Sequence, residues 1–209
     1  MDASSLAFLA QSLLIGLSIA APVGPIGLLT IQRSLDRGWA AGFATGMGAA
    51  VADGIYGAVG AFGVAAVVNA LVAARTWLTV AGVAFIAYLA WSIWRREPAT
   101  AAAGEGAPAD LRRYFVGTLF LTLSNPLTIL SFVAVFASLS RGFVGHSPWL
   151  MIGGVFAGSA AWWLALSLGV GRLRERFDVG WRRRINRASA VALVALAVWQ
   201  LIALFDAAR

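Results

Sequence analysis

The stretch "AAPVGPIGLL" (residues 20–29) carries two prolines and a glycine within a longer run, residues 3–32, that contains no charged residue. Proline lacks a backbone N–H and clashes with the preceding turn, so a helix seldom tolerates two prolines within four residues. The uncharged run is long enough to cross a hydrocarbon core of about 30 Å. The sequence therefore predicts a membrane helix that is interrupted near its middle, at Pro22, Gly24 and Pro25.

The composition of the whole chain also indicates an integral membrane protein. Its 209 residues are 60% hydrophobic and 12% charged, and the mean hydropathy is +0.82. Soluble domains carry about 25% charged residues. The absence of cysteine excludes disulfides and thiol redox chemistry, and a single histidine leaves little scope for a histidine-rich metal site.

Hydropathy divides the chain into six apolar segments, which predict an all-α, polytopic membrane protein. A link rich in Ala, Gly and Pro (97–111) separates a first three-helix half (1–96) from a second (112–209), and we expect it to be flexible. The segments are 5–31, 40–68, 77–94, 114–137, 149–171 and 188–205.

The distribution of arginine predicts the orientation in the membrane. The chain has sixteen basic residues, all of them arginine. With six spans, thirteen lie in the links that follow the first, third and fifth spans, and only Arg75, Arg141 and Arg209 lie on the other side. Cytoplasmic links carry the excess of positive charge, so both termini are expected to face away from the cytoplasm.

The two halves contain similar sequences in the same order. The motif "SLDRGW" (34–39) recurs as "SLSRGF" (138–143), and the same offset carries Pro22 onto Pro126. Three spans per half is an odd number, so the second half is inverted relative to the first. Inverted repeats with interrupted helices indicate a transporter whose binding site lies between the halves; a duplication for structural reasons alone is the alternative.

Interrupted helices create a candidate binding site. A break frees backbone N–H and C=O groups that lipid cannot satisfy, so they must face protein, water or a ligand. Half-helix N-termini attract carboxylates and freed carbonyls attract ammonium groups, and an amino-acid zwitterion offers both. The predicted substrate-binding residues at the two breaks are Pro22, Gly24, Pro25, Asn125 and Pro126; two ordinary proline kinks are the alternative.

Asp53 is the candidate for proton coupling, because no other acid lies clearly inside a predicted span. A charge there costs about 3 kcal/mol on insertion scales. Gly46, seven residues earlier, places Asp53 on a face of small residues that allows helices to approach closely, so Asp53 should point into the bundle. Burial disfavours the charged carboxylate and suits it to carry a proton; a structural acid is the alternative. Tyr56 is a further candidate for lining the cavity.

Other features carry less information about chemistry. No second acid at membrane depth supports a metal site, and no phosphate-binding loop supports ATP hydrolysis, so no cofactor, enzyme activity or nucleic-acid partner is expected. Trp162 and Trp163 serve either packing or cavity lining. The arginine-rich loop 172–187 either contacts anionic membrane lipid or serves as the orientation signal, which we favour. The helix-two glycines fit internal packing or a homo-oligomer equally.

Three motifs together resemble the lysine exporter and homoserine/threonine resistance (LysE/RhtB) family. They are "PVGP" (22–25), "GMGAAVADGIYG" (46–57) and "NPLTILSF" (125–132), and the likeness covers almost the whole chain. The resemblance implies export of amino acids or related small metabolites across a bacterial inner membrane, driven by the proton gradient. It carries over to Gly24, Pro25, Asp53, Asn125 and Pro126.

The chain departs from that family at two positions. The family's common Pro-Gly-Pro reads Val23-Gly24-Pro25, with a proline displaced to Pro22, and the basic residue that often follows its Asn-Pro is Leu127. The lost charge leaves the identity of the solute open. An inorganic cation exporter of the same superfamily and a structural assembly subunit are the competing hypotheses, and the missing cysteines exclude a thiol–disulfide electron carrier.

Overall fold

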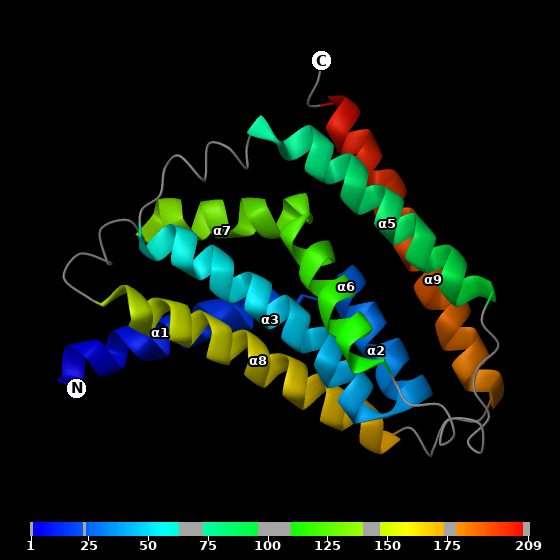
Figure 1. The fold of residues 1–209 in the computed structure, drawn as a ribbon, viewed down its shortest axis with the longest axis horizontal. Coiled ribbons are helices and arrows are strands. Elements are labelled where there is room, and N and C mark those ends of the chain that lie inside the picture. Colours follow the sequence, from blue (N-terminus) through cyan, green and yellow to red (C-terminus); the bar gives the residue numbers. More distant parts are fainter. Residues whose placement is uncertain are drawn as a thin grey trace.

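The computed structural model describes residues 2–22, 24–62, 73–95, 110–139, 147–173 and 179–206. Every regular element within these ranges is a helix, so the all-α prediction is confirmed for the described part of the chain. The helices are α1 (Ala3–Ala20), α2 (Pro25–Arg37), α3 (Trp39–Ala61), α5 (Arg75–Arg95), α6 (Leu111–Leu123), α7 (Pro126–Leu139), α8 (Pro148–Leu173) and α9 (Val179–Asp206) (Figure 1).

Two of the six predicted segments are divided at their prolines. The first consists of α1 and α2, separated at residues 21–24, and the fourth consists of α6 and α7, separated at Ser124 and Asn125. The other four segments correspond to α3, α5, α8 and α9. In the described part of the chain, three stretches are long and apolar enough to cross a membrane, namely Ala3–Ala20, Thr76–Arg95 and Pro148–Leu173. Six crossings in two inverted halves stay a prediction.

The links between segments differ from their predicted extents. The prediction of a loop over 172–187 is wrong in large part, because α8 continues through Leu173 and α9 already begins at Val179. Arginine is a good helix former, so an arginine-rich stretch extends a helix outside the apolar region. Most of the predicted linker 97–111 lies outside the described residues. Its last residues belong to α6, where the carboxylate of Asp110 accepts a hydrogen bond from the backbone N–H of Arg113 at the helix start.

The helices pack around a central pair formed by α3 and α8 (Figure 1). Helix α1 packs along α8, and α6 packs along α3. The first part of each interrupted segment therefore contacts the second segment of the other predicted half. Helix α2 contacts α3, α8 and α9. Helices α5 and α9 run in opposite directions as a pair at one side of the bundle. This reciprocal packing is what an inverted duplication would produce, and it places both breaks beside α3.

Glycines allow the helices to approach closely. A Cβ atom at Gly158 of α8 would collide with the backbone carbonyl of Leu13 on α1, and a Cβ at Gly48 of α3 would collide with the backbone carbonyl of Phe115 on α6. Small residues at such contacts let backbones come together, which is the usual means of helix association in lipid. The central helices therefore hold their neighbours through backbone contacts that larger side chains would block.

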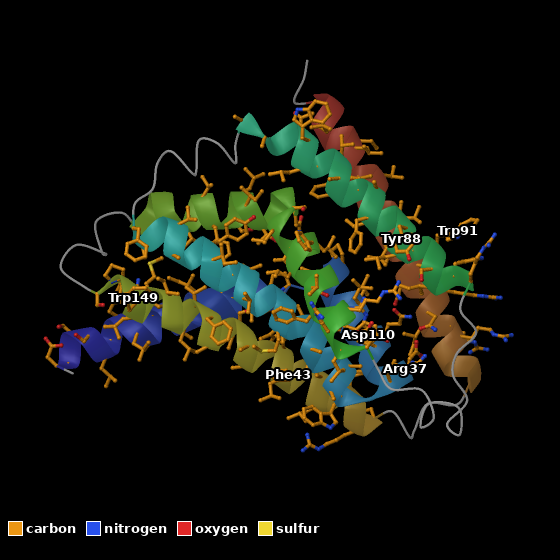
Figure 2. The ribbon with its side chains drawn as sticks, in the orientation of Figure 1. Arg37, Phe43, Tyr88, Trp91, Asp110 and Trp149 are labelled. Carbon is orange, nitrogen blue, oxygen red and sulfur yellow. The ribbon has the colours of Figure 1, made fainter. Side chains whose placement is uncertain are left out.

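The surface of the bundle is apolar while hydroxyl groups are buried. Trp77 is 79% exposed and Trp149 is 70% exposed, whereas Ser12, Thr45 and Ser159 are completely buried. Figure 2 shows Trp149 at the end of the bundle opposite Arg37 and Asp110. Extended apolar surface of this kind is unusual for a water-soluble monomer and suits a lipid surrounding. Trp39 and Trp94 are exposed as well, and exposed tryptophans near helix ends are typical of membrane–water interfaces.

Gly38 makes the tight turn between α2 and α3. Its φ angle of 88° is the one positive φ among the described residues, and it serves as the end of α2 and the start of α3. A side chain disfavours this conformation, so the glycine of "SLDRGW" is required by the turn. Most of the corresponding motif, 138–143, lies outside the described residues.

The glycine contacts predict a difference between two substitutions on the same helix. Gly158→Ala places a methyl group against the backbone of α1 and should lower the free energy of unfolding by about 1–3 kcal/mol, as overpacking does. Gly153→Ala meets open space and should leave stability unchanged or raise it by up to about 1 kcal/mol through helix propensity. Unfolding in mixed detergent micelles measures both. Equal effects of the two substitutions would contradict the role of close packing at Gly158.

Candidate functional site

A pocket of about 220 Å³ lies where the two interrupted helices meet α3 and α8. Five of the residues predicted for the site line it together: Pro22, Gly24, Pro25, Asp53 and Asn125. They come from three parts of the sequence that are far apart, so the fold brings the two breaks and the acid to one place. A space of this size suits a small metabolite.

The first wall of the pocket is the start of α2. The backbone N–H of Gly24 bonds to the carbonyl of Pro22 at 2.9 Å, and the helical bonding resumes with the N–H of Leu28 donating to the carbonyl of Gly24 at 3.1 Å. Pro25 occupies the first helical position, which suits a residue without an N–H. Gly24 has no side chain to cap the helix, so the first turn of α2 presents its positive dipole end at the pocket wall.

The second wall is the start of α7. The backbone N–H of Asn125 donates to the carbonyl of Thr122 at 3.1 Å, and the N–H of Ile129 donates to the carbonyl of Asn125 at 3.1 Å. Proline at position 126 begins α7, as Pro25 begins α2. Thr128 and Ser131 of α7 line the pocket beside Asn125. Two helix N-termini, both beginning with proline, therefore meet at the same pocket.

Asp53 lies on α3 between these walls and is only 3% exposed. The hydroxyl of Ser159 on α8 donates a hydrogen bond of 2.7 Å to its Oδ2 atom. The indole Nε1 of Trp163, one turn further along α8, donates to the Ser159 hydroxyl at 3.1 Å. The orientation predicted from the spacing to Gly46 is thus observed, since the carboxylate faces the bundle interior and lines the pocket.

Tyr56 has a different place from the one predicted. It is buried outside the pocket, its hydroxyl donates a 2.7 Å hydrogen bond to the backbone carbonyl of Leu123, and its ring stacks on Phe132 at 5.2 Å between centroids. Leu123 is the last residue of α6, so the tyrosine satisfies a carbonyl that the break leaves without a helical partner. Tyr56 is not among the residues that line this pocket, and it supports the break from behind. Its part in substrate binding stays a prediction. Pro126 adjoins the wall as the first residue of α7.

Several lining residues were not predicted from the sequence. Thr122 on α6 and Thr128 and Ser131 on α7 give the wall its hydroxyl groups, and Trp163 gives it an aromatic side chain. Trp163 is 3% exposed and also belongs to the hydrophobic core, so it both packs in the core and lines the cavity. Trp162 packs against the core without lining the pocket. In the described part of the chain, Asp53 is the one charged residue in the wall.

Arg33 links α2 to α3 and α6. Its Nη1 atom donates to Thr45 Oγ1 on α3 at 2.9 Å and to Thr118 Oγ1 on α6 at 3.3 Å, and its guanidinium carbon lies 4.3 Å from the centre of the Tyr114 ring. The pocket lies one to two turns from Arg33 and its partners, toward the start of α2 and toward the ends of α3 and α6. Arg33 lies one turn before Arg37 on α2, and Figure 2 shows Arg37 and Asp110 at the end of the bundle opposite Trp149. One side chain thus joins three pocket helices near the arginine-rich end.

The sequence is similar to known proteins over most of its length. The family model described as "LysE type translocator" matches residues 17–203. The chain is 24% identical over 188 residues to the Bacillus subtilis (strain 168) protein named "Putative amino acid efflux protein YcgF", covering 87% of this chain and 89% of the relative.

A second relative is the "Uncharacterized membrane protein YahN" of Escherichia coli (strain K12). It is 26% identical over 177 residues, which cover 83% of this chain and 79% of the relative. No solved structure matches the chain. The match to the family model spans both breaks, Asp53 and the α8 residues that contact it.

The contact of Tyr56 with the second break predicts a loss of stability on its removal. Tyr56→Phe deletes the hydroxyl and leaves the carbonyl of Leu123 buried without this donor, which should cost about 1–3 kcal/mol of unfolding free energy. Tyr88→Phe is the matched control, because Tyr88 is 53% exposed. Unfolding in mixed micelles measures both variants. A Tyr56→Phe protein as stable as the control would show that the bond does not support the break.

Proposed function

The chain belongs to the LysE type translocator family, and from that premise we propose that it is a secondary active exporter of amino acids or related small metabolites, coupled to proton antiport. The observation that carries the proposal is the position of Asp53. It is a buried acid in the wall of a pocket where two interrupted helices begin. The name of the relative from Bacillus subtilis describes amino acid efflux, which supports an amino acid as the cargo.

The charges around the pocket suit a zwitterionic solute. The N-termini of α2 and α7 carry partial positive charge and would face the solute carboxylate, while Asp53 would face its ammonium group. Binding of this kind, at the ends of discontinuous helices between two halves, is a common arrangement in secondary transporters. The hydroxyl groups of Thr122, Thr128 and Ser131 supply neutral partners for other polar groups of the solute.

Proton antiport follows if Asp53 holds either a proton or the solute's ammonium group. A carboxylate buried in a low-dielectric wall is costly when charged and unpaired. Solute binding would therefore favour the charged carboxylate, and loss of the solute would favour uptake of a proton. Exchange of the two ligands on opposite sides of the membrane gives export driven by the proton gradient.

The proposed location is a bacterial inner membrane, with several spans and both termini on the non-cytoplasmic side. The apolar surface and the family support a membrane protein. The uneven distribution of arginine supports the orientation. In this orientation Arg33 lies between the pocket and the cytoplasm, so loading from the cytoplasm requires its contacts with α3 and α6 to open.

Export of an inorganic cation is the competing hypothesis. In the described part of the chain, no three His, Cys, Asp or Glu side chains lie together as a metal site would require. A stabilisation screen of the purified protein against amino acids, nucleosides and divalent metal ions separates the two hypotheses. A rise in melting temperature with a divalent metal alone would favour the cation exporter.

Replacement of Asp53 tests the proton coupling. In proteoliposomes, Asp53→Asn should abolish transport of the best stabilising solute driven by a pH gradient and leave the protein folded, because the amide can neither carry a proton nor pair as an anion with the solute's ammonium group. Asp2→Asn is the control, since Asp2 lies at the exposed N-terminal cap of α1. Gradient-driven transport by Asp53→Asn at the wild-type rate would exclude the proton role.

Removal of Arg33 tests the closed end of the pocket. The natural chain has no cysteine, so a single cysteine introduced by Thr122→Cys reports access to the pocket wall. Arg33→Ala should increase labelling by a membrane-impermeant maleimide applied from the arginine-rich side, because three helices lose a common partner. Arg113→Ala, on the exposed start of α6, is the control. Unchanged labelling in Arg33→Ala would show that other contacts keep this end closed.

A further inference from the structure

The hydrogen bonds from Trp163 through Ser159 to Asp53 have a fixed direction. An indole N–H only donates, so the hydroxyl oxygen of Ser159 must accept from Trp163 Nε1 at 3.1 Å. A serine hydroxyl has one proton to give, and Ser159 gives it to Asp53 Oδ2 at 2.7 Å. The indole therefore holds Ser159 in the orientation that stabilises a charged carboxylate. Free rotation of the hydroxyl would remove this preference.

The indole of Trp163 is held between the pocket and α3. It lines the pocket and is nevertheless 3% exposed, because α3 packs against its other side at Gly46. A Cβ atom at Gly46 would collide with the Cβ atom of Trp163 and lie 2.5 Å from its Cγ. The indole consequently has no room to move toward α3. It can move only into the pocket, and only when no solute occupies that space.

We propose that Trp163 and Ser159 are positioning residues that couple occupancy of the pocket to the protonation of Asp53. The proposal rests on the proposed function, in which Asp53 carries the coupling proton. A solute in the pocket holds the indole against Ser159, and Ser159 then donates to the carboxylate. When the pocket empties, the indole moves away, Ser159 rotates, and Asp53 takes up a proton. Solute and proton thereby exclude one another, as antiport requires.

Few other groups in the described part of the chain act on Asp53. On α3, Tyr56 lies one turn away, but its hydroxyl is engaged by the carbonyl of Leu123. The groups that α8 presents to Asp53 are the neutral Ser159 and Trp163. The wall residues from α1, α2, α6 and α7 are uncharged, and the polar ones are Thr122, Asn125, Thr128 and Ser131. The Ser159 hydroxyl is thus the direct polar contact through which the surroundings set the charge of Asp53.

The test titrates Asp53 in the full-length protein in lipid nanodiscs. Infrared difference spectra are recorded as the pH changes, and the carboxylic acid band that Asp53→Asn lacks is assigned to Asp53. Ser159→Ala should move the midpoint of this band to higher pH by about one unit, which is a tenfold change in proton affinity. Trp163→Phe keeps a ring and removes the donor, so its midpoint should move in the same direction.

Two variants on α8 serve as matched controls. Ser167→Ala removes another buried hydroxyl two turns further along the helix, and Trp162→Phe alters the neighbouring indole, which lies outside the pocket wall. Both should titrate as the wild type does. A wild-type midpoint in Ser159→Ala and Trp163→Phe would overturn the proposal, because the hydrogen bonds would then not set the charge of Asp53.

The coupling is tested with an equimolar mixture of the protein amino acids as the probe solute. The mixture should lower the wild-type midpoint, and Trp163→Phe and Gly46→Ala should abolish this shift. Gly54→Ala should retain it, because a Cβ there meets only ordinary contacts with Phe156. The coupling would be overturned if the mixture did not change the wild-type midpoint, or if it shifted the midpoint of Trp163→Phe by the same amount. The proton role of Asp53 fails separately, if the wild type shows no titrating Asp53 band.

Discussion

The constraint behind this structure is that backbone N–H and C=O groups inside a bilayer must find partners within the protein. An unbroken helix would satisfy these groups within itself. In the two interrupted helices, the surrounding structure supplies partners for backbone groups at the breaks. Tyr56 bonds the carbonyl of Leu123 at the second break, and short local bonds from Gly24 and Asn125 close each turn. The starts of α2 and α7 face a common pocket. The pocket is therefore a consequence of where the backbone is broken.

Local rules made the breaks and the acid predictable from the sequence. Proline removes a hydrogen bond from the interior of a helix, so Pro22, Pro25 and Pro126 mark interruptions of apolar segments without any knowledge of the fold. The spacing from Gly46 to Asp53 places both on one face of a helix, and the small residues of that face pack against neighbours. These signals depend on a few adjacent residues, and the described structure agrees with them.

The remaining contacts depend on how one helix lies against another, which no local pattern encodes. Ser159 meets Asp53 because α8 crosses α3 at a particular register, and the glycines that allow this approach do not specify it. Tyr56 shares the Asp53 side of α3, yet one turn of displacement takes it out of the pocket to Leu123. Helix α9 starts earlier than its apolar segment because the arginine-rich stretch before it lacks the pattern of a membrane span, yet arginine has a high helix propensity.

The same geometry bears on the departure at Leu127, where the resembling family often has a basic residue. An acid in a low-dielectric wall repels an anionic solute unless a cation accompanies it, and Asp53 is the one charged group among the described wall residues. The positive ends of α2 and α7 supply only partial charges, each about half an elementary charge. In the proposed function they would together balance one carboxylate of the solute, while Asp53 would balance one ammonium group. Such an arrangement would favour solutes with an ammonium group and disfavour those with a second carboxylate.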